Sequence, residues 1–147
     1  MTGQGQATDI PSQELSVLHV NIQGWVSHCD ELAARLRLME SNPALICANE
    51  TFLNKAVQEI KLEGYVEAYR LGRRSGKQSG GVLMLAATEI APSVAFLADG
   101  SATDERFWAI VHSIHGPLAF CVWYRPPGHA ESEEMKRFEA ELLEHSS

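Results

Sequence analysis

An apolar run of strand length that ends in a carboxylate constrains this chain more than any other feature. Residues 44–48 are continuously apolar, and Asn49 and Glu50 follow them directly. A strand buried on both faces reads as such a run, and α/β sheets bind ligands at the carboxyl ends of their strands. We therefore expect Glu50 to lie at a ligand-binding edge of a sheet. If this strand end is considered alone, the alternative is that Glu50 is a turn or helix-start residue exposed to water.

The preceding segment repeats this arrangement. Residues 15–20 have the alternating pattern of a strand, and Asn21 follows before a turn that includes Gly24. Two neighbouring strands that each end in an oxygen-bearing side chain can hold a hard cation or a phosphate. This repetition favours a functional role for Glu50 over the exposed turn.

The order of elements predicts a mixed α/β fold. Residues 27–41 have the spacing of an amphipathic helix, with Leu32, Leu36 and Met39 on its apolar face, so β-α-β with a parallel strand pair opens the chain. Later strands are predicted at residues 65–70, 82–87, 93–97, 106–113 and 117–123, and a helix is predicted at residues 131–145. Only one helix is predicted before the last one, and a single helix cannot cover so many buried strands. We therefore expect this chain to be part of a larger sandwich.

Composition limits the classes of function. The chain has 147 residues, with 12 Lys and Arg against 19 Asp and Glu, and its net charge of −7 argues against a general nucleic-acid binder. Arg70, Arg73, Arg74 and Lys77 nevertheless form a local basic cluster without an acidic residue. A solvated loop is one interpretation of this cluster, and a local contact to phosphate is the other.

Targeting signals and cysteine pairs are not evident. Residues 1–13 lack the pattern of a signal peptide and are expected to be a disordered lead-in, and no apolar stretch approaches the length of a membrane span. Three scattered cysteines argue against a disulfide framework and a structural zinc site. We expect an intracellular protein, nuclear or cytoplasmic, with no membrane partner.

Four motifs at predicted strand ends together resemble those of a known family. They are Asn21-Ile22-Gln23-Gly24, Asn49-Glu50-Thr51, Ser79-Gly80-Gly81-Val82 and Trp123-Tyr124-Arg125-Pro126-Pro127. In this order they resemble the endonuclease/exonuclease/phosphatase superfamily, most closely the apurinic-type endonuclease domain of non-LTR retrotransposon polyproteins. The resemblance implies that residues 14–147 form the N-terminal half of such a domain. The fold would be a partial four-layer α/β sandwich, a mixed sheet with its second half missing.

The resemblance also implies hydrolysis of DNA phosphodiester bonds with Mg²⁺ or Mn²⁺. Glu50 matches the glutamate that binds the metal, and Asn21 matches the asparagine that orients the metal site or the phosphate. Tyr124 matches the tyrosine whose hydroxyl points at the scissile phosphate. We expect all three in one shallow cleft. The alternatives are an Asn21 that only caps its turn and a Tyr124 whose hydroxyl lies in water.

Other residues are expected to act around these three. Arg73 and Arg74 lie in the loop that faces nucleic acid in the family. Gly80 and Gly81 are expected to allow close backbone packing, and Glu105 to make a structural hydrogen bond near the site rather than to bind metal.

The chain departs from the family in its last part. The Gly-Asp-x-Asn and Ser-Asp-His motifs, which supply an aspartate and a histidine, have no match, and Asn49 stands where glutamine or serine is usual. We therefore expect a fragment that is inactive alone, with DNA and the remainder of its own domain or polyprotein as partners. The uncovered apolar faces would be residues 82–87 and 118–123. The alternatives are a non-catalytic remnant or binding module, or a phosphodiesterase or phosphatase of the same superfamily. The sequence leaves the oligomeric state open.

Overall fold

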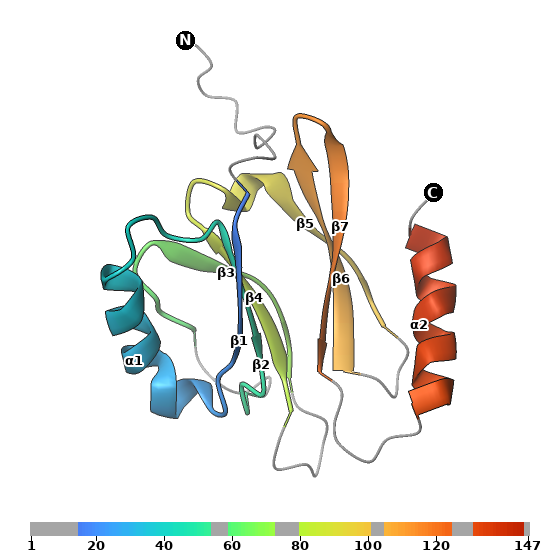
Figure 1. Cartoon of the computed structure of the whole chain (residues 1–147), viewed down its shortest axis with the longest axis horizontal. Coiled ribbons are helices and arrows are strands. Elements are labelled where there is room, and N and C mark those ends of the chain that lie inside the picture. The colour runs from blue at the N-terminus through green and yellow to red at the C-terminus, as the bar shows by residue number, and fades with distance from the viewer. Residues whose placement is uncertain (1–14, 54–58, 73–79, 101–104, 125–130, 146–147) are drawn as a thin grey trace.

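The computed structural model describes residues 15–53, 59–72, 80–100, 105–124 and 131–145. The lead-in expected at residues 1–13 lies outside the described residues. The elements, in chain order, are β1 (Val17–Asn21), α1 (Trp25–Arg37), β2 (Leu45–Asn49), β3 (Tyr65–Leu71), β4 (Val82–Ala87), η2 (Ala91–Ser93), β5 (Val94–Asp99), β6 (Glu105–Ser113), β7 (Gly116–Tyr124) and α2 (Glu131–His145). Figure 1 shows them arranged as two sheets between two helices.

The first sheet has the strand order β1-β2-β4-β3. β1 and β2 run parallel, and β4 is antiparallel to both of its neighbours, β2 and β3. The predicted β-α-β unit is therefore confirmed. Ile46 and Ala48 of β2 pack in one core with Leu32 and Leu36 of α1, because alternate residues of a strand point to opposite faces. This helix covers the outer face of the sheet.

The second sheet is antiparallel, with the order β5-β6-β7. It covers the inner face of the first sheet and forms a second core with it, to which Cys47, Met84, Phe107 and Val122 contribute. Every residue of β4 is buried. The prediction that residues 82–87 leave an uncovered apolar face is therefore wrong, because the three later strands already cover them.

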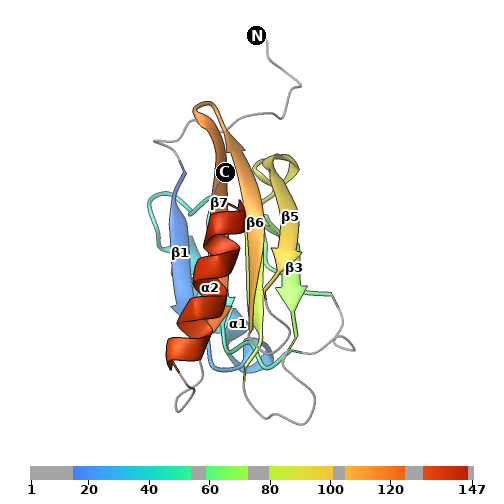
Figure 2. The ribbon, with the colours of Figure 1, turned by 90° about the vertical axis from the view of Figure 1, so that its right-hand side faces the viewer.

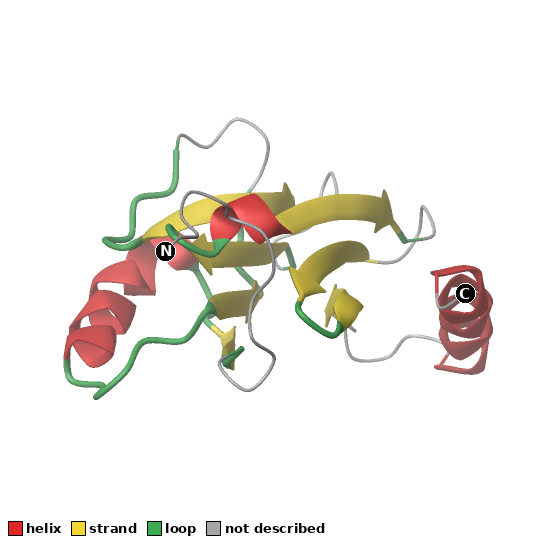
Figure 3. Ribbon diagram, turned by 90° about the horizontal axis from the view of Figure 1, so that it is seen from above, coloured by secondary structure: helices red, strands yellow, loops and turns green. Residues whose placement is uncertain are grey.

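Helix α2 packs on the outer face of the second sheet, across β6 and β7 (Figure 2). Phe138 stacks on Trp108 and Trp123, with ring centroids 5.7 Å and 4.8 Å apart. Seen from above, the order in space is α1, the first sheet, the second sheet and α2 (Figure 3). The predicted mixed α/β class is confirmed.

The first helix differs from its prediction at both ends. It begins at Trp25, directly after Gly24, whose φ of 108° suits glycine, and it ends at Arg37 rather than at residue 41. Leu32 and Leu36 are buried, whereas Met39 lies beyond the helix and is 44% exposed. Met39 was therefore wrongly assigned to the apolar face.

Within the described part of the chain, neither helix has the length and hydropathy to cross a membrane.

Candidate functional site

The carboxyl ends of the two parallel strands bring Asn21 and Glu50 together. The register pairs Asn21 with Asn49, so Glu50 follows at the same end of the sheet. The Nδ2 amide of Asn21 donates a hydrogen bond of 2.7 Å to Oε2 of Glu50. The prediction that these two side chains share one edge is confirmed, and the hydrogen bond joins the ends of the two strands.

The backbone after β2 takes an unusual conformation. Glu50 and Phe52 have φ angles of 54° and 60°, in the left-handed region that side chains other than glycine, asparagine and aspartate rarely adopt. Two donors from the turn after β1 hold this segment: Gly24 N–H bonds to the Glu50 carbonyl and Trp25 N–H to the Thr51 carbonyl, both at 2.8 Å. Such strained backbone persists where the surrounding structure enforces it and is common at functional sites.

The glycine pair before β4 holds the same segment from the other side. The carbonyl of Gly80 accepts from the N–H of Phe52 at 2.9 Å, and that of Gly81 accepts from the N–H of Thr51 at 3.3 Å. The prediction that Gly80 and Gly81 serve close backbone packing is confirmed.

Glu105, the first residue of β6, lies against this glycine pair. Its carboxylate is buried, and Oε1 accepts a hydrogen bond of 2.7 Å from the N–H of Gly81. The expected structural hydrogen bond near the site is thus present. Oε2 of Glu105 is buried without a hydrogen-bond partner among the described residues.

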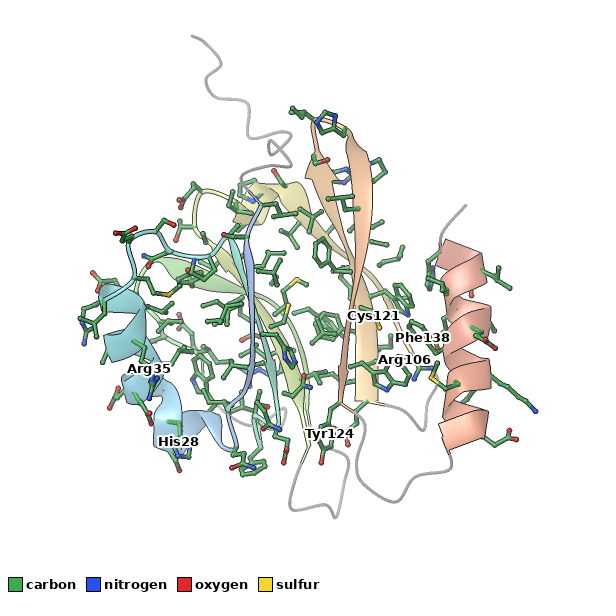
Figure 4. All side chains as sticks on the ribbon, viewed as in Figure 1. His28, Arg35, Arg106, Cys121, Tyr124 and Phe138 are labelled. Carbon is green, nitrogen blue, oxygen red and sulfur yellow. The ribbon has the colours of Figure 1, made fainter. Side chains whose placement is uncertain are left out.

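Tyr124 ends β7 at the same edge of the molecule, directly opposite Glu105 in the β6–β7 ladder. The neighbouring Trp123 carbonyl accepts a hydrogen bond of 3.0 Å from Nδ2 of Asn49, which joins the end of β7 to the end of β2. Tyr124 is only 8% exposed and belongs to the core between the sheets, and Figure 4 shows it at the lower end of β7. Its contact with a scissile phosphate stays a prediction.

A hollow of about 260 Å³ adjoins Asn21 on the side of α1. It is lined by Val20, Asn21, Ile22, His28, Glu31, Leu32 and Arg35. Figure 4 labels His28 and Arg35 on α1, and Arg35 pairs with Glu31 at 3.1 Å. Glu50 and Tyr124 do not line this hollow, so the cleft expected to hold all three residues stays a prediction.

The donors at the edge suit part of a site for a hard cation. Mg²⁺ keeps several waters and often takes only one or two protein carboxylates. Glu50 offers one carboxylate and Asn21 one amide oxygen, and the two side chains touch. Among the described residues, no group of three or more His, Cys, Asp or Glu side chains could hold a metal. Arg73 and Arg74, the expected contacts to nucleic acid, lie outside the described residues.

No family model and no curated protein matches this sequence. Among solved structures, the chain is similar to the crystal structure of the AP endonuclease LMAP from Leishmania major, with a TM-score of 0.58 and 13% sequence identity. The similarity covers 88% of this chain and 47% of that one, so this chain spans about half the length of its structural neighbour. The described chain therefore has an AP-endonuclease-like α/β fold.

Proposed function

We propose that residues 14–147 are the N-terminal half of a metal-dependent DNA endonuclease domain that hydrolyses phosphodiester bonds. The observation that carries this proposal is the Asn21–Glu50 hydrogen bond of 2.7 Å at the carboxyl edge of the sheet. It places the motif residues of two separate strands in one group. The nuclease-like fold supports the same proposal.

The site residues take the following roles in this proposal. Glu50 ligates Mg²⁺ or Mn²⁺, and Asn21 orients that carboxylate and the phosphate. The cation supplies neutralisation of phosphate charge and activation of water. Tyr124 approaches the phosphate with its hydroxyl, while Arg73 and Arg74 contact the DNA backbone.

The remainder of the domain is the second element of the proposal. The structural neighbour is about twice as long as the matched part, since 47% of it is covered. The remaining half would complete a four-layer sandwich beside the edge strands β1 and β7 and supply the acidic and histidine side chains. The motif Tyr124-Arg125-Pro126-Pro127 favours the non-LTR retroelement branch. We expect residues 1–147 alone to hydrolyse DNA negligibly.

Binding of Mn²⁺ to the chain as it stands tests the proposal directly. Paramagnetic broadening in NMR spectra is expected at Asn21 and Glu50 and should disappear in Glu50→Gln. Glu133→Gln is the matched control, because Glu133 is an exposed carboxylate on α2, away from this edge, whose pair with Lys136 is also exposed. Equal broadening in Glu50→Gln and the wild type would contradict the metal role.

A non-catalytic binding module of the same fold is the second candidate. The packing of Tyr124 in the core between the sheets, at 8% exposure, favours it, because a buried side chain offers little surface to a phosphate. Duplex DNA that binds with unchanged affinity in Glu50→Gln and with no response to Mn²⁺ would support this candidate.

A further inference from the structure

We propose that Glu105 is a positioning residue for Glu50 and acts through the backbone of Gly80 and Gly81. The proposal rests on the proposed function, because it assigns Glu50 to a metal. Glu105 begins β6 of the second sheet, whereas Glu50 directly follows β2 of the first. The contact between Glu105 and Gly81 therefore crosses between the sheets.

The first link is a buried hydrogen bond that involves a carboxylate. Oε1 of Glu105 accepts from the N–H of Gly81 at 2.7 Å, and Glu105 is 3% exposed. Hydrogen bonds to an ionised group are about twice as strong as neutral ones, and burial removes competition from water. This contact therefore fixes the position of the glycine pair relative to β6.

The packing around this link is tight. A Cβ atom at Gly80 would lie 2.5 Å from Oε1 and 2.8 Å from Oε2 of Glu105. The carboxylate thus occupies the space in which any other residue at position 80 would carry its side chain. A side chain at position 80 would therefore require the Glu105 carboxylate to move.

The second link connects the glycine pair to the metal-binding segment. The carbonyls of Gly80 and Gly81 accept from Phe52 and Thr51, the two residues that follow Glu50. Glu50 and Phe52 both have positive φ angles, of 54° and 60°, which they would leave if the segment were released.

The carboxylate of Glu50 has little support of its own. The hydrogen bond from Asn21 is exposed to water, so the direction of the Glu50 side chain depends on the backbone that carries it. An anchor for residues 51 and 52 is therefore an anchor for the Glu50 carboxylate. Partners of this kind behind a metal ligand typically change metal affinity by about 10- to 100-fold.

Glu105→Ala and Glu105→Gln together test the proposal. In Glu105→Ala we expect the Thr51 and Phe52 amides to exchange with solvent at least about tenfold faster, because the acceptor that anchors Gly81 is lost. We expect the affinity for Mn²⁺ to fall by about tenfold. Glu105→Gln keeps an acceptor oxygen and should restore both properties in large part. Unchanged exchange at Thr51 and Phe52 in Glu105→Ala would overturn the proposal.

Ser113→Ala is the matched control. Ser113 is also buried on β6, at 2% exposure, and its Oγ donates to the Gly116 carbonyl at 2.8 Å, at the opposite end of the strand. This variant should leave Thr51, Phe52 and Mn²⁺ affinity unchanged. If Glu105→Ala does not fold, Glu105→Asp replaces it, because its shorter side chain keeps the charge but withdraws from Gly81. Unchanged exchange at Thr51 and Phe52 in Glu105→Asp would then overturn the proposal.

The two proposals can fail separately. A wild-type chain that binds no Mn²⁺ contradicts the proposed function, while the exchange rates of Thr51 and Phe52 still decide whether Glu105 positions the segment. Normal Mn²⁺ binding together with unchanged exchange in Glu105→Ala contradicts only the positioning role.

Discussion

The side-chain amide of Asn21 lies 2.7 Å from the carboxylate of Glu50, although 29 positions separate the two residues in the sequence. The parallel pairing of β1 and β2 creates this contact, because both strands end at one edge of the sheet. Glu50 reaches it with a backbone φ of 54°. The carboxylate is thus held in place at a cost in backbone strain.

Glu50→Gly should therefore give a more stable fold than Glu50→Ala, because glycine adopts this backbone conformation without strain. In the left-handed region a residue with a Cβ atom costs about 1 kcal/mol more than glycine. We expect the free energy of unfolding in urea to be about 1 kcal/mol higher for Glu50→Gly than for Glu50→Ala. Both variants should lose Mn²⁺ binding. A Glu50→Ala protein as stable as Glu50→Gly would show that the backbone at this position is not strained.

A pair of glycine variants separates backbone strain from the contact with Glu105. Gly80 and Gly116 have similar φ angles, 104° and 114°, but only Gly80 has atoms within 4 Å of the place of a Cβ. We expect Gly116→Ala to lower the free energy of unfolding by about 1 kcal/mol. Gly80→Ala should cost about 1–3 kcal/mol more, because the Glu105 carboxylate must move. Equal losses in urea unfolding would contradict the close packing.

Sequence patterns predicted the elements that local composition determines. The run at residues 44–48 is continuously apolar because β2 is buried on both faces, and it gave the strand and the position of Glu50 correctly. Helix α2 was predicted with its observed bounds, since its apolar residues recur at helical spacing. The sequence also predicts the close structural contacts of Glu105 and the glycine pair.

Contacts between distant segments could not be predicted in this way. Arg106 is fully buried in an apolar strand, and its partner Glu141 lies 35 positions later on α2, so local spacing relates neither to the other. The cover over β4 was missed for the same reason, because it depends on how β5, β6 and β7 pack as a sheet. The burial of Tyr124 likewise depends on the packing of the two sheets against each other.

Alkaline pH should destabilise the protein through the thiols of Cys47 and Cys121. Burial raises the pKa of Cys47 from 9.0 to about 11. The pKa of Cys121 rises from 9.0 to about 12, mainly through burial, with a lowering effect of Arg106 and a raising effect of Glu141. The folded protein holds both protons more tightly than the unfolded chain, so this contribution is complete below pH 9 and is lost as the pH rises towards 11 for Cys47 and towards 12 for Cys121. Stability should therefore fall across that range.

Thiol labelling at pH 8 checks the burial of the cysteine side chains. Thiolates are the reactive form, and Cys47 is buried, so Cys47 should react with a disulfide reagent only after unfolding. Cys29 on α1 and Cys121 on β7 are half-buried and are the remaining thiols. Rapid reaction of all three thiols in the folded protein would contradict the burial of Cys47.

The ion pair between Arg106 and Glu141 should decide whether α2 stays on the second sheet. Arg106 is fully buried and bonds to both carboxylate oxygens of Glu141, at 2.8 Å and 2.6 Å, while Trp108 donates to the same carboxylate at 2.7 Å. Removal of one partner from a buried pair leaves the other charge uncompensated, so Glu141→Ala should cost about 3–5 kcal/mol. Urea unfolding and the near-UV circular dichroism of Trp108 would show the loss. Glu133→Ala is the control on the same helix, because its pair with Lys136 spans 4.0 Å between exposed side chains and should change stability by less than about 1 kcal/mol. Similar effects of the two substitutions would mean that the aromatic stack on Phe138, rather than the ion pair, holds α2.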